Sequence, residues 1–230
     1  MAPLFSRLAD FDADVYRNIL SLAPSAHLFD DLVSDPAEHA VLVAAEMRHS
    51  AGRAGIVEPA LFYSQAIGYP FEADITHASR FGDGATRTWY GALDEATALA
   101  ETAWHALRQL RAEGITRIVE RDRAVYAVRA TALLLDLRPH VDAFPWLRGD
   151  DYSQTMAVGR RAASQGLPGM LYASARWAGD CLVAFTPDAL TNPRRLRSLT
   201  YRIDPVQGRV AVAQGKRTLR VLAEAELRPG

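Results

Sequence analysis

The chain has 230 residues, which is enough for one large domain, or for one domain with an N-terminal extension, around a substantial core. Its 26 Lys and Arg residues balance 27 Asp and Glu residues, so it lacks the basic excess typical of proteins that bind nucleic acid generically or lie on anionic lipid. A single cysteine, Cys181, excludes an intramolecular disulfide framework, and no apolar run has the length of a signal peptide or a bilayer span, so we expect a soluble cytoplasmic protein.

Two helices are predicted in the N-terminal part of the chain. Residues 3–22 carry apolar side chains at spacings of three to four, the period of a helix with one buried face. Asp35 is followed by proline and then glutamate at the positions favoured in a first helical turn, which predicts a helix to about Ser50. Glycine and proline interrupt residues 56–84, so that stretch is predicted to be irregular.

A strand and a long helix are predicted next. Arg87–Ala92 contains Thr, Trp and Tyr in succession, which favours a strand. Asp94 is predicted to cap a helix of about twenty residues that ends at Gly114. The apolar stripe of that helix consists of Ala96, Ala100, Ala103, Leu107 and Leu110. Glu101 and His105 share the face beside the stripe, where a carboxylate at the edge of the core can be partly desolvated.

The rest of the chain is predicted to consist mainly of strands. Strands are predicted over residues 115–120, 124–137, 170–173 and 181–185, with a closing hairpin around Asp204–Gly208. One further helix is predicted over Ser153–Gln165. Helices come first and strands later, without regular strand–helix–strand alternation, so the sequence predicts a mixed α+β domain rather than a doubly wound sheet.

Several familiar chemistries lack their motifs. Gly82-Asp83-Gly84 does not complete a dinucleotide-binding fingerprint, and Lys216, the one lysine, does not stand in a P-loop. No Gly-x-Ser-x-Gly segment marks a serine hydrolase, and six dispersed histidines with one cysteine do not form a zinc motif. We therefore expect no metal site, and no classical nucleotide-binding loop.

Three polar segments are candidates for a site. The first is the helix face that carries Glu101, and the second is the loop Thr76–Gly84, which holds His77 and Arg80. The third is the strand that ends at Arg176; Ser174 and Arg176 share one side of it because side chains alternate along a strand. Taken singly, each segment is typical of a solvated surface, and none of them alone points to a function.

The order of four short segments, however, resembles the RES domain family, which is named for an arginine, a glutamate and a serine. The segments are Ser79-Arg80-Phe81, Trp89-Tyr90-Gly91-Ala92, Thr97-Ala98-Leu99-Ala100-Glu101-Thr102 and Gly169-Met170-Leu171-Tyr172-Ala173-Ser174-Ala175-Arg176. The resemblance spans about residues 76–186. Many relatives have Gly-Arg-Trp at the first segment, and shorter relatives carry a further arginine on an early strand, for which Arg48 and Arg53 are candidates without a matching motif.

The resemblance also implies a fold and a domain division. RES domains have a core similar to that of ADP-ribosyltransferase toxins, a mixed sheet with flanking helices. The first 70 or so residues resemble an extension found in longer members. We therefore expect a helical N-terminal extension at residues 1–70, packed on a RES catalytic domain at residues 71–230.

The activity that the resemblance implies is consumption of NAD+ as a substrate, by cleavage of its nicotinamide–ribose bond. The acceptor of ADP-ribose (water, phosphate or a protein side chain) stays open at this point. A carboxylate can stabilise the oxocarbenium-like ribose and a guanidinium can hold a diphosphate, which suits Glu101 and Arg80. The resemblance implies catalytic roles for Glu101, Arg80 and Ser174, and cofactor contacts from Arg80, Tyr90, His77, Ser174 and Arg176.

The resemblance further implies a partner and a biological role. RES proteins are toxins of bacterial toxin–antitoxin pairs, and the antitoxin has a helix-turn-helix domain and a C-terminal segment that blocks the active-site entrance. We expect no direct binding of nucleic acid or membrane by this chain, and a homodimer or a hetero-assembly with the antitoxin fits equally well. The alternative is a non-catalytic binding module, in which Arg80, Glu101 and Ser174 are ordinary surface groups.

Overall fold

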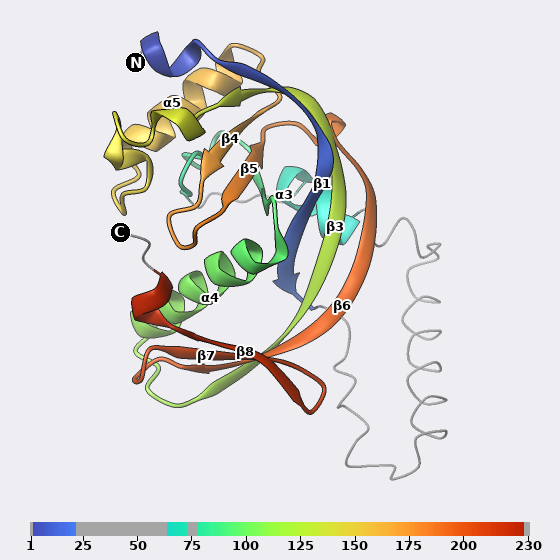
Figure 1. Cartoon of the computed structure of the whole chain (residues 1–230), viewed down its shortest axis with the longest axis vertical. Helices are drawn as coiled ribbons and strands as arrows, with labels where there is room; N and C mark the ends of the chain where they lie inside the picture. Colours follow the sequence, from blue (N-terminus) through green and yellow to red (C-terminus); the bar gives the residue numbers. More distant parts are fainter. Residues whose placement is uncertain (1, 22–63, 73–77, 228–230) are drawn as a thin grey trace.

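The structure, a computed structural model, describes residues 2–21, 64–72 and 78–227 (Figure 1). The described strands are β1 (Leu8–Leu20), β2 (Trp89–Ala92), β3 (Val119–Asp136), β4 (Gly169–Ala173), β5 (Asp180–Ala184), β6 (Leu190–Asp204), β7 (Arg209–Gln214) and β8 (Arg217–Ala223). The described helices are a π-helical turn (Ser64–Gly68), α3 (Tyr69–Glu72), α4 (Glu95–Ala112) and α5 (Ser153–Ser164), with 3-10 turns at Ala2–Phe5, Arg138–His140, Pro145–Leu147, Pro187–Ala189 and Glu224–Leu227. This confirms the predicted mixed α+β class.

The described strands form one sheet in the order β1-β2-β5-β4-β3-β6-β7-β8. β1 pairs with β2 and also, antiparallel and along its whole length, with β3, so five strands join in a closed circuit. β3 and β4 are parallel neighbours, while the pairs β2–β5, β4–β5, β3–β6, β6–β7 and β7–β8 are antiparallel. The long strands β1, β3 and β6 curve around one side of the molecule and α4 lies inside the curve (Figure 1).

The helix predicted over residues 3–22 is wrong, because residues 8–20 are strand β1. The acidic side chains at 10, 12 and 14 alternate with Ala9, Phe11, Ala13 and Val15, which is the period of two of a strand. The larger apolar residues have a helical spacing, but thirteen consecutive residues pair with β3, from Leu8↔Leu135 to Leu20↔Arg123. This pairing makes the segment a strand. This part of the expected helical extension therefore belongs to the sheet. The helix predicted from Asp35 to Ser50 lies outside the described residues, and the domain division at residue 70 stays a prediction.

Most of the other predicted elements among the described residues are confirmed, but the stretch 56–84, predicted to be irregular, contains the helical turns Ser64–Gly68 and Tyr69–Glu72, and strand β8 was not predicted. α4 begins at its N-cap Asp94, whose Oδ1 accepts a hydrogen bond of 2.8 Å from Thr97 N, and ends just before Gly114, whose φ of +70° favours glycine. The segments predicted at 115–120 and 124–137 are one long strand, β3, whose pairing with β6 contains two register shifts. Such bulges bend a strand, and β3 can thereby follow the curve of the sheet.

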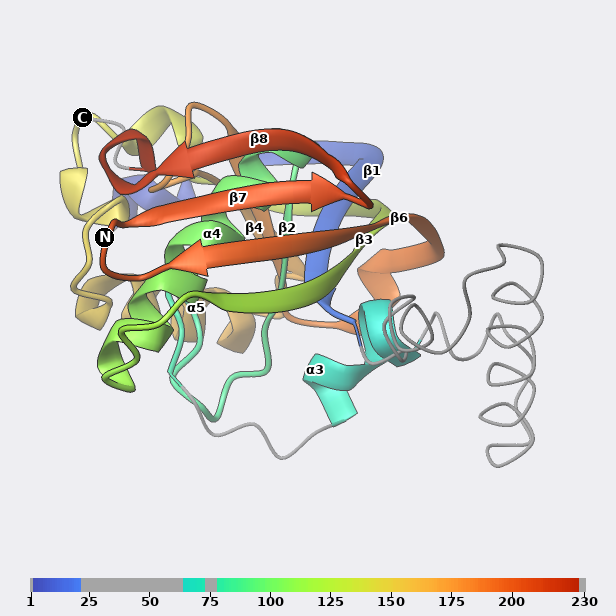
Figure 2. The ribbon, with the colours of Figure 1, turned by 90° about the horizontal axis from the view of Figure 1, so that it is seen from below.

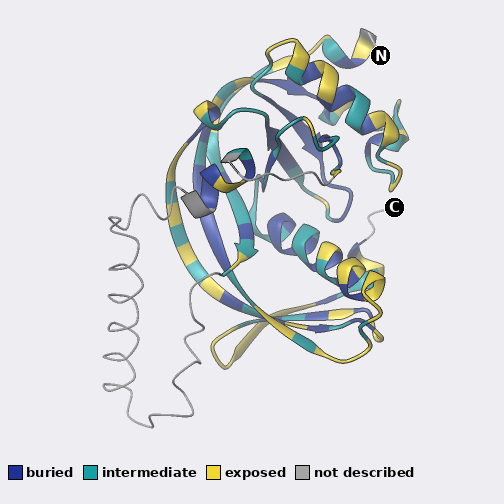
Figure 3. Cartoon of the chain, turned by 180° about the vertical axis from the view of Figure 1, so that it is seen from behind, coloured by how far each residue is buried: buried dark blue, intermediate teal, exposed yellow. Residues whose placement is uncertain are grey.

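Three apolar clusters hold these elements together. In the first, Trp104 and Leu107 of α4 pack on buried side chains of β6, β7 and β8. Figure 2 shows the ribbons of α4 and these three strands from below. The second joins α5 to β4 and β5, and the third packs the π-helical turn against Trp89 of β2. Figure 3 shows the inner face of α4 buried and its C-terminal end exposed. α4 thus packs on β6, β7 and β8 with one face, and Glu101 and His105 on another face border a cavity.

Candidate active site

A cavity of about 610 Å³ lies between α4, β1, β2, and the loop that precedes β2. Of the predicted site residues, Arg80, Tyr90 and Glu101 line it. Its other charged or titratable lining side chains include Arg17, His105, Arg108 and Arg123. Among the described residues of the lining, Glu101 is the one carboxylate. An excess of arginines around a single carboxylate suits a ligand that carries negative charge.

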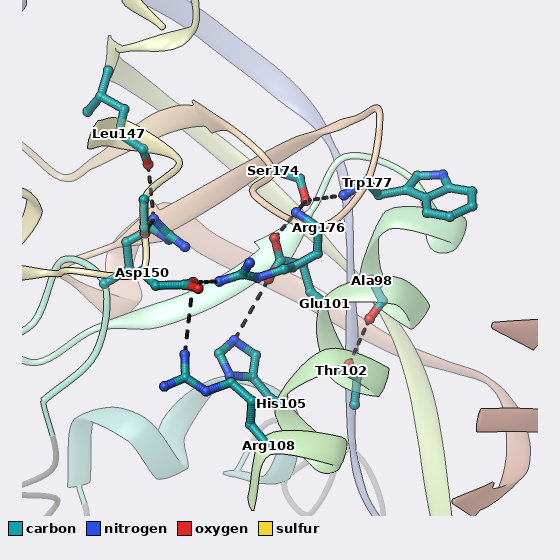
Figure 4. A network of polar contacts seen from close by, with 12 residues as sticks. Ala98, Glu101, Thr102, His105, Arg108, Leu147, Asp150, Ser174, Arg176 and Trp177 are labelled. Carbon is teal, nitrogen blue, oxygen red and sulfur yellow. Dashed lines mark hydrogen bonds and ion pairs between the residues drawn. The ribbon is translucent and has the colours of Figure 1, made fainter. Parts of the chain in front are cut away.

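Ser174 holds Glu101 in place from behind the cavity. Its hydroxyl donates to Glu101 Oε1 at 2.6 Å (Figure 4). Ser174 is fully buried, and its Oγ accepts hydrogen bonds of 3.0 Å from the backbone N–H groups of Arg176 and Trp177. Since these donors occupy the lone pairs of the hydroxyl oxygen, its proton is left for Glu101. The structure thus brings together the glutamate and the serine from α4 and from the turn after β4.

The other oxygen of Glu101 faces His105. Glu101 Oε2 lies 3.8 Å from His105 Nε2, one helical turn further along α4 (Figure 4). Desolvation lowers the pKa of His105; Glu101 opposes that effect, and Arg176, Arg80 and Arg108 add to it. The imidazole is therefore neutral at neutral pH, and it can accept or donate a hydrogen bond beside the carboxylate.

Arg80 is buried in the wall of the cavity, with 8% of its surface exposed. Its Nη1 donates to the carbonyl oxygens of Leu147 and Gly149 at 3.0 and 2.9 Å. Its guanidinium carbon lies 4.7 Å from the centre of the Tyr152 ring, a cation–π distance. These contacts set the guanidinium rigidly at the edge of the cavity.

Tyr90 orders the loop that carries Arg80. Its hydroxyl lies 2.9 Å from Ser79 Oγ and accepts a hydrogen bond of 2.9 Å from the backbone N–H of Phe81. Burial raises the pKa of Tyr90, so the phenol stays neutral at physiological pH. The ring lines the cavity, and the stacking role predicted for it stays a prediction.

We expect Tyr90→Phe to destabilise the protein by about 1–3 kcal/mol, because it leaves the partly buried N–H of Phe81 without its acceptor. The measurement is chemical denaturation of the two proteins. Tyr69→Phe is the control: Tyr69 is 59% exposed, and loss of its hydroxyl is expected to leave the free energy of unfolding within about 0.5 kcal/mol. Equal stability of Tyr90→Phe and the wild type would show that the hydroxyl does not order the loop.

Two of the predicted cofactor contacts, Ser174 and Arg176, are not among the described residues of the cavity lining. His77 lies outside the described residues. Arg176 is 3% exposed and is not among the described residues of the lining; its guanidinium pairs with Asp150 and lies 4.0 Å from the centre of the Trp104 ring. The predicted contact of Arg176 with the cofactor stays a prediction.

Sequence reasoning missed Arg17, on β1. Arg17 lines the cavity, and its Nε and Nη1 are buried without a hydrogen-bond partner among the described residues. Burial lowers its pKa to about 9, so it remains a cation at neutral pH, and its guanidinium lies 5.1 Å from the centre of the Trp89 ring. The alternation of acids and apolar residues in β1 was the signal that could have revealed it. The earlier candidates, Arg48 and Arg53, lie outside the described residues.

A second missed arginine, Arg123 on β3, lies on the same side of the cavity. It donates from Nε to Asn18 Oδ1 at 3.1 Å, and Asn18 Nδ2 in turn donates to the Tyr201 hydroxyl at 2.6 Å. Burial lowers the pKa of Arg123 to about 10. Arg123 is thus a cation fixed by its hydrogen bond to Asn18, and it adds to the positive potential of the cavity.

The curved mixed sheet encloses a cavity in which Glu101, hydrogen-bonded to Ser174, is surrounded by arginines. These features define a domain suited to an anionic ligand. The RES domain family model matches residues 53–204, more than half of the chain, and the chain therefore belongs to the RES domain family. This confirms the predicted family; the assignment of Arg80, Glu101 and Ser174 as the arginine, glutamate and serine of its name stays a prediction.

The remaining comparisons add a distant structural likeness. A chain of the M. tuberculosis MbcT–MbcA toxin–antitoxin complex is 15% identical, with a TM-score of 0.47, over 86% of this chain and 88% of that chain. No curated protein matches the sequence. Within the described ranges there is no group of three or more His, Cys, Asp or Glu that could hold a metal ion, and no helix long and apolar enough to cross a membrane.

Proposed function

We propose that this RES domain is the toxin of a bacterial toxin–antitoxin pair and that it cleaves NAD+ at the nicotinamide–ribose bond. The observation that carries the proposal is Glu101, the one carboxylate among the described lining residues, which is fixed by Ser174 and surrounded by arginines. NAD+ combines a ribose that develops positive charge with a diphosphate that carries negative charge. Both kinds of partner line this cavity.

Glu101 would act on the ribose. In the reaction the bond between C1′ and the nicotinamide nitrogen breaks, its electron pair leaves with nicotinamide, and C1′ becomes oxocarbenium-like. A fixed carboxylate stabilises that charge more in the transition state than in the bound substrate, which is the condition for catalysis. The Ser174 hydroxyl occupies Oε1, so Oε2 is the oxygen available to a ribose hydroxyl or to the proton of an acceptor.

Arg17 and Arg80 would bind the diphosphate. Arg80 is held by two carbonyls and a tyrosine ring, whereas Arg17 has two buried nitrogens with no partner among the described residues. A phosphate oxygen would supply the acceptor that these nitrogens lack, and charge-assisted bonds of this kind are the stronger hydrogen bonds of proteins. Tyr90 would contact one of the two aromatic rings of NAD+.

A protein that consumes NAD+ must be restrained in its own host. We therefore include in the proposal a cognate antitoxin that covers the mouth of this cavity, and action on the cytoplasmic pool of NAD+. The antitoxin would also supply the DNA binding that the near-neutral charge of this chain does not favour. Water, phosphate and a protein side chain are the candidate acceptors of ADP-ribose.

The purified protein is expected to release nicotinamide from NAD+, measured by chromatography with and without phosphate. Faster release with phosphate, together with ADP-ribose 1″-phosphate, would identify phosphorolysis; free ADP-ribose would identify hydrolysis. A mass increase on a host protein in a cell extract would identify transfer. Binding of NAD+ with no nicotinamide release under any of these conditions would refute the enzyme and favour the non-catalytic module.

A further inference from the structure

Three arginines converge on the segment 147–152, which lies between the 3-10 turn Pro145–Leu147 and α5. Arg80 donates to two of its carbonyls, as described above. Arg176 donates from Nη2 to Asp150 Oδ1, and Arg108 Nη1 lies 3.9 Å from the same oxygen (Figure 4). Asp150 therefore joins this segment to α4 and to the turn after β4.

Arg176 needs a counter-charge because it is buried. Its side chain is 4% exposed, whereas that of Asp150 is 49% exposed. One face of the guanidinium lies against Trp104. An isolated guanidinium is costly to bury, and Asp150 is the carboxylate that the structure pairs with it. The pair thus fixes where the side chain of Arg176 lies.

The position of Arg176 bears on Glu101 through Ser174. The backbone N–H of Arg176 is one of the two donors that orient the Ser174 hydroxyl, and that hydroxyl holds Glu101 Oε1. A shift of the turn that contains Arg176 would release this donor, and the serine proton would no longer be directed at Glu101. The chain of contacts therefore runs from Asp150 to Arg176, then to Ser174 and Glu101 (Figure 4).

We propose that Asp150 is a positioning residue that acts through Arg176 and Ser174 to hold the Glu101 carboxylate in its reactive orientation. The inference rests on the proposed function and deepens it. It also gives Arg176 a role other than contact with the cofactor: its guanidinium anchors the turn that supports the catalytic carboxylate. Asp150 could act by a second route, through the segment 147–152 on Arg80, but that route would affect substrate binding rather than turnover.

A double-mutant cycle on nicotinamide release tests the proposal. Asp150→Ala and Ser174→Ala are each expected to lower kcat about tenfold to a hundredfold with KM for NAD+ within about twofold, since a small misplacement of a catalytic group affects the chemical step. The double variant is expected to have the kcat of Ser174→Ala alone within about twofold, because both changes break the same chain of contacts. Asp150→Asn is expected to recover part of kcat, since its amide oxygen still accepts from Arg176.

Controls separate this role from a general loss of structure. Glu224→Gln removes an exposed ion pair with Arg111 at the far end of α4, 2.8 Å in length, and is expected to leave kcat and KM unchanged. Thermal melting checks each variant; if Asp150→Ala does not fold, Asp150→Asn replaces it in the cycle. A rise in KM at unchanged kcat, or multiplicative effects in the double variant, would overturn the proposal. An inactive wild type would refute the proposed function, whereas an active wild type with a multiplicative cycle would refute only the role of Asp150.

Discussion

Glu101→Gln is expected to lower the rate of nicotinamide release about a thousandfold. Glutamine keeps the size of the side chain and an oxygen that accepts from Ser174, but it removes the negative charge that faces the oxocarbenium-like ribose. Loss of one well-placed electrostatic contact in a cavity costs a factor of about a hundred to a thousand, and Glu101 has no second carboxylate beside it among the described lining residues. The measurement is single-turnover nicotinamide release at saturating NAD+.

The fold of the Glu101→Gln variant is expected to be intact. The side chain is 20% exposed and its hydrogen bond to Ser174 can persist, so circular dichroism and the melting temperature should match those of the wild type. Glu113→Gln, at the exposed C-terminal end of the same helix, is the matched control and should retain full activity. Wild-type turnover by Glu101→Gln would remove this carboxylate from the mechanism.

Arg17→Met is expected to raise KM for NAD+ about tenfold to a hundredfold, without loss of stability. The guanidinium would form charge-assisted hydrogen bonds with the diphosphate, each contributing about 1.5–3 kcal/mol. In the free protein its Nε and Nη1 have no partner among the described residues, so an apolar side chain of similar length should be tolerated equally well or better. Substrate titration gives KM, and chemical denaturation gives the free energy of unfolding.

The pH dependence of stability gives an independent check on Arg17. Burial lowers its pKa to about 9, so between pH 9 and the higher pKa of an exposed arginine the unfolded chain binds more protons at this position than the folded protein does. Stability should therefore rise with pH in that window, and the cost of burying the cation is fully present below about pH 9. The amount by which the free energy of unfolding of Arg17→Met exceeds that of the wild type should therefore shrink as the pH rises above 9.

Arg129→Met is the matched control for this prediction. Arg129 lies on β3 next to β1, but it pairs with Asp12 on an exposed part of the sheet and is not among the described lining residues. Its replacement is expected to leave KM unchanged. An equal rise in KM for both variants would mean that Arg17 acts only through the general charge of the protein.

Local sequence was sufficient for the helix that carries Glu101. Asp94 caps α4 as expected, and Ala100, Ala103, Leu107 and Leu110 of the predicted stripe are buried, with Glu101 beside them. Ala96 is not among these buried residues, and the packing of the stripe on β6, β7 and β8 was not predicted. The order of four short segments was sufficient for the family. These features depend on residues close together in the chain, where a single helical turn or strand period decides which side chains share a face.

The early strand shows where this kind of reasoning fails. Residues 8–20 satisfy a helical period in their larger apolar residues and a strand period in their acids, and both patterns are compatible with one buried face. Pairing with β3, more than a hundred residues further along the chain, decides between them. Without that pairing Arg17 could not be assigned to the cavity.

Amino-acid order alone therefore identified the family and the mixed α+β class, and it singled out Arg80, Tyr90 and Glu101, which line one cavity. Only the folded chain showed that the Ser174 hydroxyl donates to Glu101 and that Arg176 is paired with Asp150. It also showed that Arg17 joins the other arginines that line the cavity. The reason is physical: which groups meet across a cavity depends on long-range strand pairing and on the curvature of the sheet, and these are set by the packing of the whole domain rather than by the preferences of any one segment.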